Sequence, residues 1–346
     1  MYSGWRRLTL IIRIFVMIRA LLRLLLLLTV SMGALTTVAQ TSLSTDKNSS
    51  VSASQLDPVL LQAKSLLEKG SVADAERVTR SYLQSHSSSP DGHFLLGLIL
   101  FKEVKAKDSL AEYTAGAQYR DPSAYELEVA GLDYVLLNDY MNADKWLSKS
   151  VQIDSHNWES WYYLGRTKYN ENRFEEAVNA FQKVLDLSPK NVKAEDNLGL
   201  SYAGLGRKQE AEQAYRTAIR WQSQLLEEDP GPYLDLGILL IDQDRPQDAI
   251  PYLKRASEIS PHDSKAHEHL GKAYERLNRL PEAQVELEKA IAAKPHDGPL
   301  HYVLGQIYRR QGMKDKAQAE FDRVITLKSM PSGAQVINSP APPSSH

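Results

Sequence analysis

Apolar residues recur through the middle of the chain at the three- and four-residue spacing of amphipathic helices. Trp161, Leu164 and Gly165 share one helical face, and the polar stretch 171–173 then interrupts the pattern. A second stripe follows, and Ser188-Pro189 ends it. Its members are Phe174, Ala177, Val178, Phe181 and Val184. The pattern predicts two helices joined by a tight turn.

This two-helix pattern repeats along the chain. A glycine that follows a leucine or, once, an alanine returns every 34 residues, with a single spacing of 38 between Gly199 and Gly237. The glycines are Gly97, Gly131, Gly165, Gly199, Gly237, Gly271 and Gly305. Twelve residues after each glycine stands a second small residue: Ser109, Ala143, Ala177, Ala211, Ala249, Ala283 and Ala317.

The repeated glycine predicts a close contact between two helices. A glycine inside a helix costs about 1 kcal/mol relative to alanine, so its return at one position needs a physical reason. A residue without a Cβ atom lets helix axes approach closely. We expect the small residue twelve positions later to lie opposite the glycine on the second helix.

The spacing of 38 adds four residues, which is close to one helical turn. We expect the second helix of this repeat to lengthen by a turn, through Trp221 and Leu225, and to end before Pro230.

At these positions the chain resembles tetratricopeptide-repeat proteins. The family's leucine, glycine, aromatic and alanine positions are met by Leu198, Gly199, Tyr202, Ala211, Tyr215 and Ala218. The resemblance implies an all-α, right-handed superhelical solenoid of antiparallel helix pairs, with a concave groove lined by the first helix of each pair. It covers residues 56–328, in repeats near 56–89, 90–123, 124–157, 158–191, 192–229, 230–263, 264–297 and 298–328.

Residues 1–39 carry five arginines and no acid. Their longest uncharged run, 24–39, is shorter than the roughly 20 residues of a comfortable membrane span, and Thr37 and Ala39 fit a signal-peptidase site. We expect a cleaved signal peptide or an uncleaved N-terminal membrane anchor, with Met17 as an alternative start. Either places the body outside the cytoplasm, periplasmic or secreted. Residues 40–55 are expected to be a flexible linker and 329–346 a disordered tail.

The composition argues against catalysis, metals and nucleic acid. There is no cysteine, and 41 basic against 43 acidic residues leave a net charge of −2, with no basic excess for phosphates. His267 and His269 stand two apart on an expected helix, so they point to different faces and cannot share an ion. We expect no catalytic residues, no metal and no cofactor, and we interpret His267 as a packing residue.

The resemblance also assigns positions to the groove. Its polar members, our candidate partner-binding residues, are Tyr162, Arg166, Tyr169, Asn170, Asp196, Asn197, Lys272, Arg309 and Arg310. Earlier repeats place Phe94, Leu98, Phe101, Leu132 and Val135 at groove positions, where they either line an apolar groove or are buried by the curvature. A carboxylate clamp for peptide C-termini is not expected, because only Asn197 matches it and Asp235 would repel a carboxylate.

These features predict a non-catalytic scaffold or adaptor that binds a segment of a protein partner in the groove. The alternative is a regulatory or recruiting subunit of an envelope enzyme or assembly complex. The oligomeric state and the partner's identity stay open.

Overall fold

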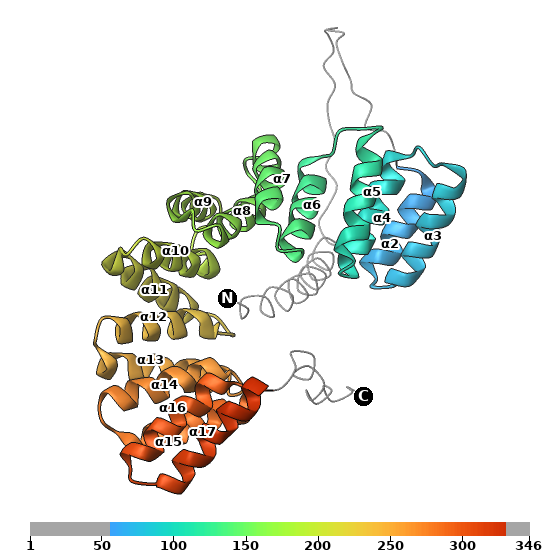
Figure 1. The fold of residues 1–346 in the computed structure, drawn as a ribbon. Coiled ribbons are helices and arrows are strands. Elements are labelled where there is room, and N and C mark those ends of the chain that lie inside the picture. The colour runs from blue at the N-terminus through green and yellow to red at the C-terminus, as the bar shows by residue number, and fades with distance from the viewer. Residues whose placement is uncertain (1–55, 330–346) are drawn as a thin grey trace, which may run out of the picture. The chain divides into compact units, whose positions relative to one another are not determined.

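The computed structural model describes residues 56–329, and these residues form sixteen α-helices and no strand (Figure 1). The all-α class and the consecutive packing of helices in pairs are confirmed. The predicted leader, linker and most of the tail lie outside the described residues, but Ser329 is the last residue of a helix. No helix among residues 56–329 has the length and apolar character needed to cross a membrane.

The described chain separates into two compact units at residues 156 and 157. The N-terminal unit contains three helix pairs: α2 (Pro58–Glu68) with α3 (Val72–Ser85), α4 (Pro90–Lys102) with α5 (Ala106–Ala117), and α6 (Ala124–Leu136) with α7 (Tyr140–Ile153). The C-terminal unit contains five: α8 (Trp158–Asn170) with α9 (Phe174–Leu187), α10 (Val192–Gly204) with α11 (Lys208–Gln222), α12 (Pro230–Asp242) with α13 (Pro246–Ile259), α14 (Ser264–Arg276) with α15 (Leu280–Ala293), and α16 (Gly298–Arg310) with α17 (Lys314–Ser329). Within each unit, every pair packs against the next.

Local residue choice explains where the first helix of each pair begins. An aspartate, asparagine or serine precedes it, and the side-chain oxygen accepts a hydrogen bond from a backbone N–H of the first turn. These residues are Asp57, Ser89, Ser123, Asn157, Asn191, Asp229, Asp263 and Asp297. The cap satisfies donors that the helix itself leaves free.

The turn between the two helices of a pair requires a left-handed backbone residue. Eight residues at this one position have a positive φ angle. They are Gly70, Val104, Asn138, Asn172, Gly206, Asp244, Asn278 and Gly312. Glycine, asparagine and aspartate tolerate this conformation, whereas Val104, with a φ of 63°, is β-branched and strained.

The repeated glycine sits at a close helix–helix contact, and at two repeats the small residue twelve positions later lies opposite it: the carbonyl oxygens of Ser109 and Ala283 lie 3.3 and 3.5 Å from the Cβ positions of Gly97 and Gly271. A large side chain four residues further along the second helix packs against the glycine as well. A Cβ atom on Gly199 would lie 2.6 Å from the ring of Tyr215, sixteen residues later, and one on Gly165 would lie 2.9 Å from the ring of Phe181. The same holds at the other five glycines, where the side chain is Tyr113, Leu147, Leu253, Leu287 or Phe321. The glycine therefore makes room for a large side chain, while the small residue twelve positions later is buried beside it.

The expected lengthening of the second helix in the fifth repeat is wrong. Helix α11 ends at Gln222, one residue longer than α9, and the extra residues form a loop before Pro230. The buried Gln222 side chain explains the loop: its Oε1 accepts from the Asp229 backbone N–H and its Nε2 donates to the Asp229 carbonyl, both at 3.0 Å. Leu225 and Leu226 are exposed on this loop instead of continuing an apolar stripe.

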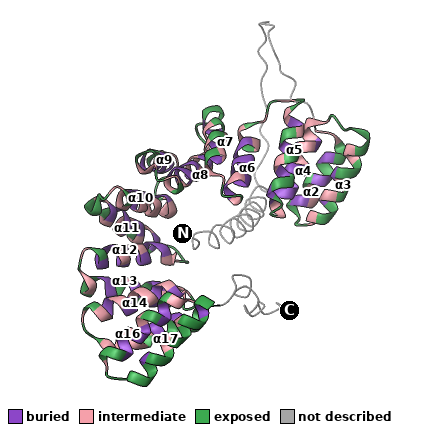
Figure 2. Ribbon diagram, viewed as in Figure 1, coloured by how far each residue is buried: buried purple, intermediate pink, exposed green. Residues whose placement is uncertain are grey.

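Buried side chains lie along the helix faces that meet other helices, whereas turns and outer faces are exposed (Figure 2). In the C-terminal unit one apolar cluster joins α8, α9 and α10, and a larger one runs from α11 to α17. The core of this unit is therefore a series of clusters built by neighbouring pairs, as expected of a repeat array.

Candidate functional site

The first helices of successive pairs form one side of the C-terminal unit, which we call the inner face. Helix α8 contacts α10, α10 contacts α12, and α12 contacts α14. All nine candidate partner-binding residues lie on these first helices: four on α8, two on α10, one on α14 and two on α16. Helix α12 lies between α10 and α14, so it separates the candidate residues on α8 and α10 from those on α14 and α16.

The residues on α8 and α10 are brought together. Asn197 Nδ2 lies 3.4 Å from the Tyr162 hydroxyl and also donates to the Lys193 carbonyl at 2.7 Å. The guanidinium of Arg166 lies over the Tyr162 ring, 5.9 Å from its centre. Burial raises the pKa of the Tyr162 hydroxyl, with the nearby Arg166 opposing that shift.

Two of the candidate tyrosines contribute to the core as well as to the surface. Tyr162 is only 7% exposed and packs edge-on against Phe181, so it offers a partner little more than its hydroxyl. Tyr169 packs edge-on against Phe174, and burial together with the negative charge of Asp235 raises its pKa. Asn170, at the end of α8, is exposed.

The structure adds residues that the sequence analysis did not select. Lys193 stands on α10, Asp229 caps α12 and Asp235 lies within α12. A Cβ atom on Gly231 would lie 3.1 Å from Asp229 Oδ1 and 3.3 Å from Asp196 Oδ2, so two carboxylates border the space above this glycine. We call Tyr162, Arg166, Tyr169, Lys193, Asp196, Asn197, Asp229 and Asp235 the tyrosine–aspartate cluster. Asp229 could have been found from its position before Pro230-Gly231, which is a helix-start signal.

The candidates on α14 and α16 form a second group, with their charges already engaged. Lys272 Nζ donates to Glu268 Oε1 at 2.6 Å. Arg310 donates to Glu275 at 3.0 Å and to Asn278 at 2.9 Å, which ties α16 to α14. Arg309 donates to Gln306 on its own helix. Arg310 therefore links neighbouring repeats, and both Lys272 and Arg310 offer a partner less charge because each is paired with a glutamate.

The apolar groove positions of the N-terminal unit are largely buried. Phe94, Phe101, Leu132 and Val135 belong to the core, and Leu98 is half-buried against it. Of the two interpretations left open by the sequence, burial holds for these residues. The guanidinium of Arg120 covers the Phe94 ring, 4.6 Å from its centre.

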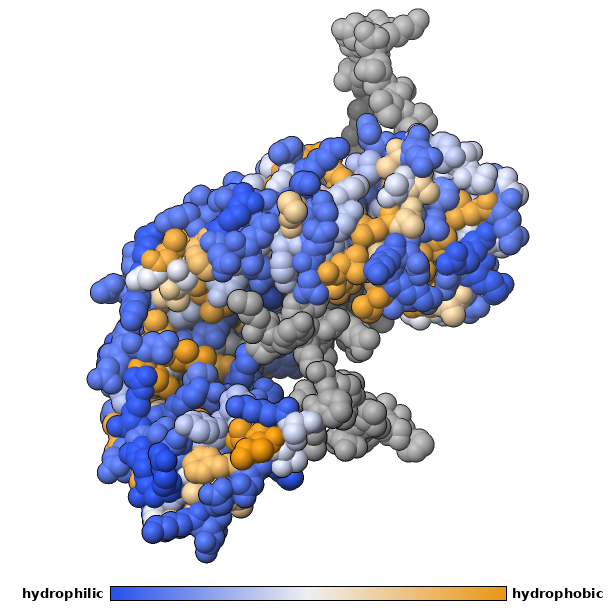
Figure 3. Space-filling view, in the orientation of Figure 1, coloured by the Kyte–Doolittle hydropathy of each residue, from blue (hydrophilic) through white to orange (hydrophobic). Residues whose placement is uncertain are grey.

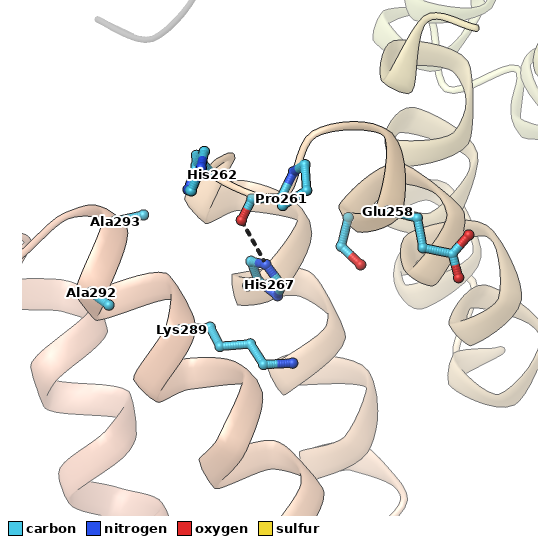
Figure 4. Close-up of a pocket in the computed structure, with 8 residues that line it drawn as sticks. Glu258, Pro261, His262, His267, Lys289, Ala292 and Ala293 are labelled. Atoms are coloured by element: carbon cyan, nitrogen blue, oxygen red, sulfur yellow. Dashed lines mark hydrogen bonds between the residues drawn. The ribbon is translucent and has the colours of Figure 1, made fainter. Parts of the chain in front are cut away.

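His267 lies in the core, beside a shallow pocket between α13, α14 and α15 (Figure 4). Its Nε2 donates to the Pro261 carbonyl at 3.2 Å, and its Nδ1 lies 2.6 Å from Glu286 on α15. His301 makes the same two contacts one repeat later, with Pro295 and Glu320. His267 thus ties a loop to the next helix, and the pocket beside it has Lys289, His262 and two alanines on its walls.

His269 faces a different environment from its neighbour two residues away. Burial lowers its pKa to about 4, with Lys272 adding to the effect, so its imidazole is neutral near pH 7. Among residues 56–329, no three histidine, aspartate or glutamate side chains are grouped in a way that could hold a metal ion.

The visible surface of the C-terminal unit is mostly hydrophilic, with hydrophobic patches over the region of α10 to α13 (Figure 3). Leu200 and Ile238, at inner-face positions of α10 and α12, are half-buried against the core. The inner face therefore combines apolar side chains with the charged and phenolic groups of the tyrosine–aspartate cluster.

Stacked helix pairs with a polar and aromatic inner face define a class of repeat proteins that bind other proteins. Sequence models described as tetratricopeptide repeat match residues 60–125, 155–230, 240–295 and 298–329. The chain belongs to the tetratricopeptide-repeat family. The fold of this family is generally non-catalytic and serves protein interaction.

Solved structures share the fold at low sequence identity. A tetratricopeptide-repeat protein from Parabacteroides merdae aligns with a TM-score of 0.57 and 17% identity, covering 72% of this chain and 97% of that one. The C-terminal part of a repeat protein from Cytophaga hutchinsonii aligns with a TM-score of 0.55 and 16% identity, covering 70% of this chain and 97% of that one. A chain of the Cut9–Hcn1 hetero-tetramer of the APC/C aligns with a TM-score of 0.54 and 18% identity, covering 80% of this chain and 54% of that one.

Among curated proteins, the chain matches the protein O-mannosyl-transferase TMTC3 of Homo sapiens and of Mus musculus. Each is 29% identical over 77 residues, which is 22% of this chain. The match spans about 8% of the length of those relatives.

Proposed function

We propose that this chain is a non-catalytic scaffold that holds a segment of a protein partner against the inner face of its C-terminal unit. One observation carries the proposal: α8 and α10 gather Tyr162, Arg166 and Asn197 into one connected set on that face. Polar groups that converge beside half-buried apolar side chains give both affinity and orientation to a bound segment.

Site-specific photocrosslinking tests the location of binding. A photoreactive residue replaces Asn170, which is exposed at the end of α8, in the full chain inside cells. The matched control replaces Asn179, an exposed asparagine on α9, the second helix of the same pair. A discrete crosslinked protein at position 170 and none at position 179 is expected. Equal crosslinking at both positions, or crosslinking at 179 alone, contradicts binding at the inner face.

We also propose that the scaffold acts outside the inner membrane, on the basis of the leader's charge and length. Alkaline phosphatase, which folds only outside the bacterial cytoplasm, is fused after Ser329 of the full chain. Phosphatase activity is expected, and it should disappear when residues 1–39 are removed. A second fusion carries green fluorescent protein, which fluoresces in the cytoplasm, at the same position. An inactive phosphatase fusion together with a fluorescent second fusion would contradict this location.

A further inference from the structure

Three histidines occupy the same position of the repeat, four residues before the recurring glycine, and each ring faces two hydrogen-bond acceptors. They are His93, His267 and His301. Their Nε2 atoms lie 2.9, 3.2 and 3.0 Å from the backbone carbonyl oxygens of Ser87, Pro261 and Pro295 (Figure 4 shows the second). Their Nδ1 atoms lie 2.7, 2.6 and 2.6 Å from the carboxylates of Glu112, Glu286 and Glu320. The same contact is therefore built three times.

The glutamate, nineteen residues after the histidine, is present only where the histidine is. In the other five repeats the histidine position holds Val59, Leu127, Trp161, Glu195 or Tyr233. The residues nineteen positions later are then Val78, Trp146, Ala180, Ala214 and Tyr252, none of which is acidic. Histidine and glutamate thus occur as one unit, which the repeat pattern by itself does not require.

Hydrogen-bond counting shows that each unit needs one proton more than a neutral histidine beside an ionised glutamate provides. A neutral imidazole has a single N–H, so when Nε2 donates to the carbonyl, Nδ1 presents a lone pair. An ionised carboxylate also only accepts, and two acceptors at hydrogen-bond distance repel. Both contacts are satisfied if the ring donates from both nitrogens, or if the carboxyl group is protonated and donates to Nδ1. In either arrangement the extra proton is part of the contact.

The titratable and charged groups around His267 come from three elements. On α15, Lys289 donates to the other oxygen of Glu286 at 2.9 Å, so it does not replace the proton between Glu286 and the ring. Glu258 on α13 and His262 in the preceding loop line the pocket beside His267 (Figure 4). Glu258 is engaged by an arginine of its own helix.

The other two histidines have fewer such neighbours. Glu320, the partner of His301, lies near the Tyr308 hydroxyl, and burial raises the pKa of that hydroxyl, so it keeps its proton. The ring of Tyr119 stacks beside His93. The proton that each contact needs is therefore held between the histidine and its glutamate.

We propose that these three contacts are proton-dependent ties, which hold at mildly acidic pH and loosen as the pH rises toward 8. Histidine is the side chain that ordinarily gains or loses a proton in this range. Because the folded chain keeps a proton that the unfolded chain releases, the ties stabilise the fold at low pH and lose that contribution as the pH rises. Two ties lie in successive pairs, α14 with α15 and α16 with α17, so the C-terminal end of the array responds most.

Glutamine in place of glutamate tests the ties in the full-length protein. A glutamine amide can donate to a neutral ring or accept from a charged one, so the double variant Glu286→Gln, Glu320→Gln no longer needs the extra proton. Between about pH 5.5 and about pH 7.5, the melting temperature of the unchanged chain should fall by about 2–4 °C relative to that of the double variant. Glu258→Gln, at an exposed site on α13, is the matched control and should follow the unchanged chain.

Hydrogen exchange locates the effect without any substitution. After correction for the intrinsic pH dependence of exchange, the protection of loops 260–263 and 294–297 should fall several-fold over the same change of pH. The loop 118–123 precedes Leu127, which forms no such tie, and its protection should stay the same. The inference is overturned if the unchanged chain and the double variant show the same pH dependence of melting. It is also overturned if the two tied loops respond to pH no more than loop 118–123.

Discussion

Seven glycines are needed because a large side chain of the second helix occupies the space where a Cβ atom would stand. At Gly199 the neighbour is the ring of Tyr215, at 2.6 Å from the Cβ position. Real Cβ atoms do not approach other atoms so closely, so a substitution must displace a buried ring or part the two helices.

Gly199→Ala should therefore destabilise the chain although alanine favours helices. We expect a loss of about 1–3 kcal/mol in the free energy of unfolding, measured by urea denaturation. Gly298→Ala is the control, because a Cβ atom there meets nothing within 4 Å. In the double variant with Tyr215→Ala the cost of the methyl group should shrink. If the destabilising effects of the two substitutions simply add in the double variant, the ring is not what excludes the methyl group.

Val104 is strained because it occupies the left-handed turn position that glycine, asparagine or aspartate fills in other repeats. Its φ angle is 63°, and its side chain is 39% exposed, so little packing compensates for the strain. Val104→Gly should raise the free energy of unfolding by about 1 kcal/mol, and Val104→Asn should raise it by a smaller amount. Thermal melting of both variants beside the unchanged chain checks this. A lower melting temperature for both would show that the valine side chain contributes packing that outweighs the strain.

Asp133 is a buried carboxyl group that joins α6 to α5. Ser109 Oγ lies 2.5 Å from Asp133 Oδ2 and 2.8 Å from the Gly97 carbonyl, and a hydroxyl has one proton to donate. A protonated Asp133 satisfies both contacts, because its own O–H can donate to Ser109. Burial raises the pKa of Asp133 to about 8, although the Ser109 hydrogen bond opposes that shift.

The raised pKa of Asp133 makes stability fall as pH rises. Between the ordinary pKa of 3.8 and about 8 the folded chain keeps a proton that the unfolded chain releases. This group alone should lower the free energy of unfolding by up to about 1.4 kcal/mol per pH unit in that window. Asp133→Asn should match the unchanged chain near pH 4, become progressively more stable than it as pH rises, and keep that advantage above about pH 8. If the free energy of unfolding depends on pH in the same way for both proteins, Asp133 is not neutral in the folded chain.

At the scale of helices, the sequence predicts most boundaries because the same local signals return with the period of the repeat. Each first helix follows an aspartate, asparagine or serine, and its turn carries a residue that tolerates positive φ, except at Val104. The sequence predicts the close contact at the glycine, but it does not predict the large side chain that packs there. A repeated small residue shows that space is short, but it does not show which side chain fills it, and Phe181 and Tyr215 stand one further turn along the second helix.

The candidate site was predictable only in part, because a repeat pattern assigns helix faces but not contacts between helices. The positions of Arg166 and Asn197 follow from their repeat slots. That Arg310 is engaged by Glu275, 35 residues earlier, requires the stacked structure. Asp229 was missed because it belongs to the repeat with four extra residues, where the period no longer indicates which residues face inward.

The loop between α11 and α12 depends on one glutamine. Gln222→Ala removes both hydrogen bonds to the Asp229 backbone and leaves buried polar groups without partners, so we expect a loss of about 1–3 kcal/mol by urea denaturation. Leu226→Ser changes a fully exposed residue of the same loop and should lie within about 0.5 kcal/mol of the unchanged chain. A Gln222→Ala variant as stable as Leu226→Ser would show that the loop closes without this side chain.

At the scale of the whole molecule, stability should be divided between two compact units. In repeat arrays each pair gains most of its stability from its own helices and from adjacent pairs. The C-terminal unit contains its own apolar clusters, one around Phe181 and Leu198 and another extending from Ala211 to Ala317. Residues 157–329 therefore meet the requirements for folding without the N-terminal unit.

We expect the fragment 157–329 to be helical by circular dichroism and to unfold cooperatively in urea. A fragment that starts at residue 206 is the control, because it keeps α11 but removes α10 and so exposes Tyr215 and Ala211, which α10 covers. Its first helix should lose structure, and its urea transition should be less cooperative than that of fragment 157–329. If fragment 157–329 is unfolded, or melts no more cooperatively than the control, the C-terminal unit needs the N-terminal repeats to fold.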